Sequence, residues 1–185
     1  MLVLAVSPQK MQNQILLRAL GSVAKSPIAS MNIYEQQVQV GQFLGRCYPR
    51  ASVAISDLGA ATYYSSVNCV DLGGLGDIEV TRARMNSTFS ADWIGRYCSD
   101  RDVLLAVLPD GAFQDFNGLP ATWRKVGSWT IKHNVVSVSD TVSFYALALS
   151  EEQPLARELV RYGGRLPRAV QQSGEYMEIV RGGTE

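Results

Sequence analysis

Residues 52–77, SVAISDLGAATYYSSVNCVDLGGLGD, contain two short apolar runs that both end at an aspartate. The first run ends at Asp57, and the second ends at Asp71, just ahead of a glycine-rich turn around Gly74. Short apolar runs bounded by turn residues are typical of buried strands. Residues 58–64 between them are compatible with a short connecting helix, so we expect two parallel strands that end at the same edge of a sheet.

The flanking sequence extends this core into an α/β layered domain. The apolar run at residues 103–108, VLLAVL, predicts a strand that is covered on both faces. Alternation at residues 126–132 and 141–149 predicts two strands that pair antiparallel at the edge of the sheet. Helices are expected at residues 8–24, 32–48, 77–85, 91–98 and 155–162. The predicted fold is therefore α/β, with a mostly parallel sheet and an antiparallel edge pair.

Local signals set the boundaries of several predicted helices. Pro27 is expected to end the first helix, and Asn32 with Glu35 three residues later is a helix-start signal. In the helix at residues 77–85, Arg82 and Arg84 are expected to point outward. Ser90 is expected to cap the helix that follows.

The chain divides into an N-terminal arm (1–30), an α/β domain (31–165) and a C-terminal tail (166–185). The apolar start MLVLAV at residues 1–6 leaves two interpretations open. It can form a short strand, or it can be the last part of a membrane helix whose beginning is missing.

Composition argues against several functional classes. The chain has 17 Lys plus Arg and 17 Asp plus Glu, with no basic cluster, so nucleic-acid binding is not expected. Cys47, Cys69 and Cys98 are far apart in sequence and the only histidine is His133, so we predict no metal site and no cofactor. An odd cysteine count allows at most one internal disulfide, and three small buried hydrophobic residues are the favoured interpretation.

The predicted strand ends provide the candidate binding residues. Ligands of open α/β sheets gather at the carboxyl ends of strands, which here carry Asp57, Asp71 and Asp110. Asp57 can instead cap the turn that follows it, and Asp110 can form a turn, whereas Asp71 has no obvious helix to cap. Tyr63 and Tyr64 can stack on a sugar ring, although tyrosines beside a strand are more often packing residues.

The turn that contains Gly74 resembles a phosphate-binding turn, because free backbone N–H groups at a helix start favour anions. Its spacing fails the dinucleotide fingerprint, whose third glycine would fall at Glu79, and a close-packed turn is the favoured interpretation. His133 and Asp140 lack a serine in a G-x-S-x-G turn, so a hydrolytic triad is not supported. We therefore assign no catalytic residue.

Three motifs together resemble a known family. They are NIYEQQ at residues 32–37, SDLGA at 56–60 with Tyr63 and Tyr64, and VDLGGLG at 70–76. The combination resembles the soluble C-terminal part of polytopic membrane glycosyltransferases of the dolichyl-phosphate-mannose-protein mannosyltransferase and aminoarabinose-transferase type. The similarity covers residues 32–76, and the remainder follows only in the order of elements.

The resemblance implies a lipid-phosphate sugar donor, an inverting transfer on the extracytoplasmic side and a partner, the membrane domain of the same enzyme, that this chain lacks. It favours the membrane-helix interpretation of residues 1–6. The family's catalytic acid lies in a region that this chain does not match. We therefore expect a membrane-associated, extracytoplasmic accessory domain that is inactive alone.

The expected contact surface for a lipid-linked sugar or glycan acceptor comprises Asp57, Tyr63, Tyr64, Asp71 and Gly74. Two alternatives remain open. One is a free-standing nucleotide- or phosphate-binding α/β enzyme that uses the glycine turn, and the other is a structural or interaction module.

Overall fold

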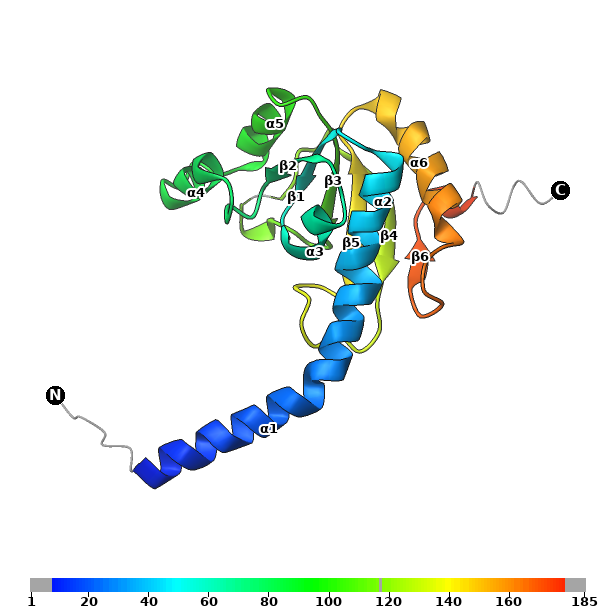
Figure 1. The fold of residues 1–185 in the computed structure, drawn as a ribbon. Helices are drawn as coiled ribbons and strands as arrows, with labels where there is room; N and C mark the ends of the chain where they lie inside the picture. The colour runs from blue at the N-terminus through cyan, green and yellow to red at the C-terminus, as the bar shows by residue number, and fades with distance from the viewer. Residues whose placement is uncertain (1–7, 117, 179–185) are drawn as a thin grey trace.

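The computed structural model describes residues 8–116 and 118–178, which form a six-stranded sheet with helices on both faces and a long helix that projects from one end (Figure 1). The elements are α1 (Pro8–Ile33), the π-helix η1 (Tyr34–Val38), α2 (Gln39–Cys47), β1 (Ser52–Ile55), α3 (Gly59–Tyr63), β2 (Asn68–Asp71), α4 (Ile78–Met85), α5 (Ala91–Ser99), β3 (Val103–Pro109), the 3-10 helix η2 (Gln114–Phe116), β4 (Arg124–Thr130), β5 (Thr141–Ala146), α6 (Leu149–Gly163) and β6 (Gln171–Ser173).

The strand order is β2-β1-β3-β5-β4-β6, with β1 parallel to both β2 and β3 and the other pairs antiparallel. This arrangement confirms the predicted α/β class with a parallel side and antiparallel edge strands. Ile55 pairs with Asp71 on one side and Val107 on the other, so the three parallel strands end together. The predicted antiparallel pair, β4 and β5, lies one strand in from the edge, because β6 from the expected C-terminal tail pairs with β4.

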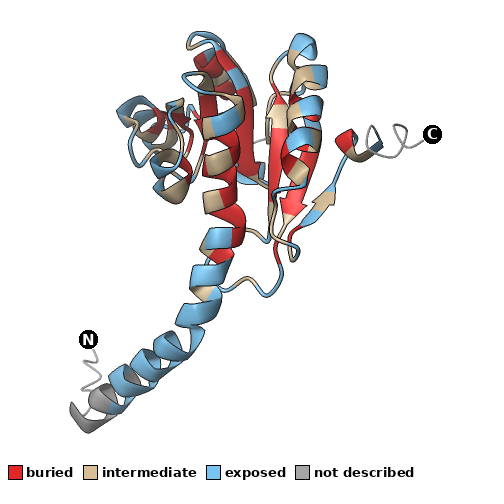
Figure 2. Cartoon of the chain, turned by 45° about the vertical axis from the view of Figure 1, so that its right-hand side comes forward, coloured by how far each residue is buried: buried red, intermediate tan, exposed pale blue. Residues whose placement is uncertain are grey.

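Each face of the sheet has its own core. On one face α2, α3 and α6 cover a cluster centred on Phe43, which makes edge contacts with Trp129, Phe144 and Tyr162. On the other face α4 and α5 cover Ala54, Ala106 and their neighbours. The alternate residues of β1 and β3 supply both clusters, as expected for strands covered on both faces (Figure 2).

Helix α1 corrects two of the expected helix boundaries. Pro27 lies inside α1, although it was expected to end the helix. The missing N–H of a proline weakens one turn and bends a helix, and Figure 1 shows that α1 bends as it leaves the domain. Asn32 is buried in the last turn of α1 rather than at a helix start. Its side chain accepts a hydrogen bond from the Val135 amide (2.9 Å) and donates one to the Lys132 carbonyl (3.3 Å).

Most of α1 is exposed to solvent, and burial begins only at Asn32 (Figure 2). Residues 1–6, for which a strand or a membrane helix was expected, lie outside the described residues. Among the described helices, none has the combination of length and hydrophobicity that crossing a membrane requires.

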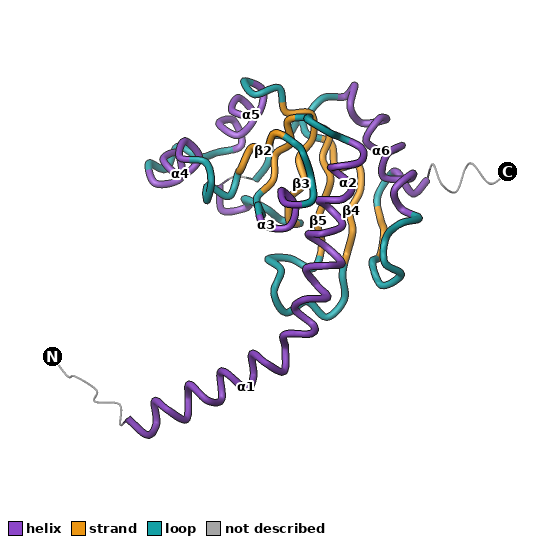
Figure 3. The backbone as a smooth tube through the Cα atoms, viewed as in Figure 1, coloured by secondary structure: helices purple, strands orange, loops and turns teal. Residues whose placement is uncertain are grey.

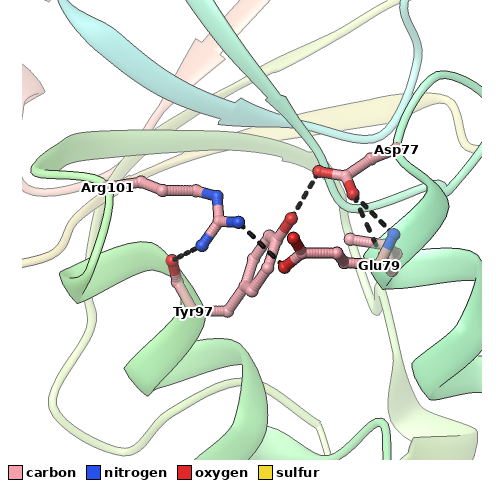
Figure 4. Close-up of polar contacts among 5 residues, drawn as sticks. Asp77, Glu79, Tyr97 and Arg101 are labelled. Atoms are coloured by element: carbon pink, nitrogen blue, oxygen red, sulfur yellow. Dashed lines mark hydrogen bonds and ion pairs between the residues drawn. The ribbon is translucent and has the colours of Figure 1, made fainter.

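Helices α4 and α5 are joined by a polar cluster that Figure 4 shows. Asp77 caps α4 by accepting from the amides of Glu79 (3.0 Å) and Val80 (3.3 Å). The Tyr97 hydroxyl donates to the same carboxylate (2.7 Å), and Arg101 stacks on the Tyr97 ring while pairing with Glu79 (2.9 Å). Burial and the adjacent Asp77 raise the pKa of Tyr97, which stays a neutral donor. The predicted Ser90 cap of α5 is confirmed by its bond from the Trp93 amide.

The three cysteines are free thiols, and the structure pairs none of them. Burial is the main cause that raises the pKa of Cys47 to about 11 and of Cys69 and Cys98 to about 12. All three are therefore protonated near neutral pH and act as small hydrophobic residues.

We expect the backbone amides of residues 15–26 in α1 to exchange hydrogen far faster than those of β3. An isolated helix is marginally stable in water, whereas β3 lies in the middle of the sheet. Hydrogen exchange followed by mass spectrometry measures both segments in one sample. Comparable protection of the two would contradict an unsupported α1 and would show that another surface covers it.

Candidate functional site

The candidate site is a groove at the carboxyl ends of β1 and β3. From β1 the chain moves to β2 on one side and then crosses to β3 on the other, with α3 on one face and α4 and α5 on the opposite face. This reversal is the topological switch point at which open α/β sheets bind ligands. We call the feature the switch-point groove; it is lined by Ser56, Asp57, Gly73, Leu75, Arg84, Pro109, Asp110, Gly111, Ala112, Phe113 and Val138.

A small apolar hollow adjoins the groove and shares several of its residues. Ser56, Asp57, Pro109 and Val138 line both spaces, and the wall behind them comes from η1 and the core. The groove therefore has an open polar part and a narrower apolar extension toward α2. Pockets that bind small molecules commonly combine apolar walls with a few polar groups in this way.

The π-helix η1 places two glutamines at this end of the sheet. Gln36 donates to the carbonyls of Ser139 (3.0 Å) and Asp140 (3.1 Å), which fixes the β4–β5 loop against the helix. Gln37 is 7% exposed and donates to the Asp57 carboxylate (3.2 Å). The π-helical geometry is rare and frequently marks functional sites, because it re-aims the side chains it carries.

The side-chain amide oxygen of Gln37, Oε1, is buried and lacks a hydrogen-bond partner among the described residues. Its amide nitrogen faces Asp57, Gln36 Oε1 (3.2 Å) and Ser137 Oγ (3.1 Å), and a carboxylate neighbour fixes this orientation. Gln37 also lines the apolar hollow. A buried acceptor without a donor costs free energy, so a hydroxyl entering the hollow would recover a lost hydrogen bond.

Arg84 supplies the positive charge of the groove. Its guanidinium lies 4.8 Å from the ring centre of Phe89 and 5.3 Å from those of Phe113 and Phe116, and it donates to the Leu72 carbonyl (3.1 Å). None of the described carboxylates forms an ion pair with it, and its Nε is buried without a partner in that part of the chain. The expected outward orientation of Arg84 is wrong, because aromatic rings from the loop after α4 and from the segment after β3 surround it.

Asp110 also lines the groove, but its carboxylate already has two partners within the chain. Lys125 pairs with its Oδ1 (2.6 Å) and the Ser143 hydroxyl donates to the same atom (2.9 Å). The bond from Lys125 is the main cause that lowers the pKa of Asp110. Asp57 is also exposed, but among the described residues its carboxylate has only the neutral Gln37 as a partner, so it is the carboxylate that remains free for a ligand.

Asp57 does not cap the turn that follows it, which corrects the capping interpretation. The residue at the N-cap of α3 is Leu58, and none of the described side chains caps this helix. The carboxylate turns instead toward Gln37 on η1. A partner from a distant segment therefore competes successfully with the local helix end.

Asp71 is buried beneath the glycine turn and does not line the groove. Its two carboxylate oxygens accept from the amides of Gly73 (2.8 Å) and Gly76 (2.7 Å). Gly74 has a φ of +84° and its carbonyl accepts from the Thr81 hydroxyl, so it shapes the turn. The amides that would hold a phosphate are thus taken by the chain's own carboxylate.

The two tyrosines are separate from the groove. Tyr63 and Tyr64 lie at the end of α3, exposed, with their rings edge to face at 5.0 Å. The backbone and Cβ of Tyr64 lie against Gly41 and Gly45 of α2, where a larger residue would clash. Of the five predicted contact residues, Asp57 alone lines the groove.

Three polar residues of the site were not among the predicted contact residues: Arg84 in the groove, and Gln36 and Gln37 in the adjoining hollow. Gln36 and Gln37 belong to a run of buried polar residues in η1, and such a run in a helix is a signal that a polar site lies nearby. For Arg84 no comparable signal exists, because two of its three aromatic neighbours, Phe113 and Phe116, come from the segment after β3, which is distant in sequence.

A comparison with protein-family models matches residues 30–145 to the family described as Domain of unknown function (DUF8728). This range is more than half of the chain, and the chain therefore belongs to that family. The matched range includes every residue of the switch-point groove. Neither the curated proteins nor the solved structures gave a match.

We expect Asp71→Asn to lower the free energy of unfolding by about 1–3 kcal/mol, because an amide nitrogen would face one of the two glycine N–H groups that the carboxylate now accepts from. Asp57→Asn is the matched control. It should change the free energy of unfolding by less than about 0.5 kcal/mol, because the Asp57 side chain is exposed and does not cap α3. Urea titration of the two variants measures both values. Equal losses would contradict the separate roles assigned to the two aspartates.

The Asp110–Lys125 pair should contribute a small acid-sensitive stability. Because the pKa of Asp110 is lower in the folded state, the contribution is complete above the unfolded pKa of about 3.9 and is lost as pH falls through the folded pKa. Both side chains are partly exposed, so Lys125→Met should cost less than about 1 kcal/mol near neutral pH and almost nothing at low pH.

Urea titrations near neutral pH and at a pH below the folded pKa of Asp110 test this difference. Lys132→Met, which removes an exposed lysine that forms no ion pair with any described residue, is the control. A cost for Lys125→Met that does not depend on pH would contradict the linkage to Asp110.

Proposed function

We propose that this member of the family binds a small hydroxylated anion of the sugar-phosphate class in the switch-point groove, and that the chain alone catalyses no transfer. The observation that carries the proposal is Arg84, a cation without a carboxylate partner among the described residues that lines a groove at the switch point. A guanidinium presents several N–H donors in a planar fork that matches phosphate and carboxylate oxygens.

The other polar groups of the site fit hydroxyl groups rather than a second anion. The Asp57 carboxylate and the buried Gln37 carbonyl oxygen are both acceptors, and sugar hydroxyls are donors that both could use. Leu75, Phe113 and Val138 add apolar surface to the groove. A ligand with an anionic end, several hydroxyls and apolar ring faces would use all three kinds of group.

The family resemblance of residues 32–76 supplies a biological context for such a ligand. We propose that the chain acts as an accessory domain of a membrane glycosyltransferase on the extracytoplasmic side, where the ligand would be the phosphate-sugar head of a lipid-linked donor. The membrane domain of that enzyme would be its partner. Sugar-phosphate binding can be tested without this context.

The geometry of the glycine turn counts against the alternative of a nucleotide- or phosphate-binding enzyme that uses it. Asp71 accepts from the amides of Gly73 and Gly76, and Asp77 accepts from the first amides of α4. A phosphate at this turn would have to displace one of these carboxylates and face repulsion from the other.

The test is a titration of the purified chain with a hexose 1-phosphate, the free hexose and inorganic phosphate, followed by amide NMR shifts. We expect the hexose 1-phosphate to bind most tightly, with shifts at Asp57, Gly111 and their neighbours. Arg84→Gln should raise the Kd at least about tenfold, equivalent to about 1.4 kcal/mol. Arg82→Gln, on the exposed side of the same helix, should leave it unchanged.

Two results would contradict the proposal. One is the absence of saturable shifts at the groove with any of the three compounds. The other is turnover of a sugar phosphate that disappears in Asp57→Asn, which would make the chain an enzyme in its own right. Thermal unfolding of Arg84→Gln checks that its loss of binding does not reflect loss of the fold.

A further inference from the structure

The outer part of α1, residues 15–31, exposes many large apolar side chains. The exposed apolar residues of this segment are Ile15, Leu16, Leu17, Leu20, Val23, Ile28 and Met31. At the base of this segment Ile28 and Met31 share an apolar pocket with Lys132 and Ala169, whereas the preceding turns of the helix extend away from the sheet and the other described elements (Figures 1 and 2). A contiguous apolar surface of this kind marks an interaction site.

Four of these apolar side chains lie on one side of the helix, and Ile15, Leu17 and Ile28 lie on its flanks. Leu16, Leu20 and Val23 follow one another at the spacing of successive helical turns, and Met31 lies two turns beyond Val23 on the same side. Arg18 and Lys25 are seven residues apart, and the same helical geometry places both on the opposite side. An apolar side combined with a basic polar side is the pattern of helices that lie in a membrane interface.

The charge of the segment has a single sign. The only charged residues between positions 8 and 34 are Lys10, Arg18 and Lys25, and the first acidic residue is Glu35, which is buried at the base of the helix. This charge is complementary to an anionic lipid surface. A coiled coil with a second copy of α1 is less favourable, because neither helix would offer an acidic side chain to pair with these basic residues.

The β4–β5 loop continues the apolar surface onto the domain. Val135, Val136 and Val138 are exposed in it, and the exposed Lys132 beside them adds a cation. Hydrogen bonds of Asn32 fix this loop against the last turn of α1, as Figure 3 shows for the two backbones. The helix and the loop therefore lie at the same end of the molecule.

We infer that the outer part of α1 and the β4–β5 loop together form a docking surface for an anionic lipid bilayer. The helix would lie along the interface with its apolar side toward the acyl chains, and the valines of the loop would extend the contact. This surface overlaps the switch-point groove at Val138 alone, and the inference does not depend on what the groove binds. Val138 belongs to both, so docking would bring the groove to the level of the lipid headgroups.

The test is cosedimentation of the full chain with phosphatidylcholine vesicles that contain or lack phosphatidylglycerol. We expect binding to the anionic vesicles, weaker binding to the neutral ones, and a decrease with salt. The double variant Leu16→Gln/Leu20→Gln should reduce binding at least tenfold. Arg18→Gln/Lys25→Gln should reduce binding to anionic vesicles about thirtyfold and remove most of the salt dependence, taking about 1 kcal/mol per charge.

The control is Ile78→Gln/Met85→Gln, which removes two exposed apolar side chains from α4, a different helix. It should bind vesicles as the unsubstituted chain does, and circular dichroism should show that all variants fold. Unchanged binding of the α1 leucine variant would overturn the inference, as would the absence of binding to either vesicle. A dimer that forms without lipid and is lost in the leucine variant, with no vesicle binding, would assign the apolar side to a second copy.

Discussion

The groove end of the sheet depends on the hydrogen bonds that Gln36 and Gln37 make from the π-helix. Gln36 holds the β4–β5 loop by two backbone carbonyls, and Gln37 holds Asp57 at the end of β1. These bonds join helix, loop and strand, three segments that are distant in sequence. Because η1 connects the exposed α1 to the buried α2, the same bonds fix the direction in which α1 leaves the domain.

The parts of the fold that could be predicted from the sequence are those with strong local signals. The apolar runs that end at Asp57, Asp71 and Pro109 correctly predicted three parallel strands, because buried strands need continuous apolar side chains. Local signals failed where distant partners compete. The Asn32 side chain was expected to start a helix but bonds to a loop one hundred residues away, and the polar strand β6 has no apolar period to reveal it.

The candidate site could be predicted in position but only partly in composition. Strand ends indicated the correct edge of the sheet, and Asp57 lies in the groove there. Asp71 illustrates why composition is harder: the same glycine turn that can bind a phosphate can also close around a neighbouring carboxylate, and sequence does not distinguish the two. Arg84 depends on Phe113 and Phe116 from a later loop, so only the tertiary structure reveals a cation without an acidic partner among the described residues.

The two proposals lead to a common consequence if both hold. A groove held at the headgroup level would encounter a sugar phosphate that is attached to a lipid far more often than one free in solution, since the docked protein and the lipid-linked ligand share a surface. Weak intrinsic affinity would then be sufficient for binding. Leu75 and Val138 add exposed apolar side chains to the groove beside its polar groups. The arrangement therefore favours a ligand with a polar head and an apolar tail over a fully polar metabolite.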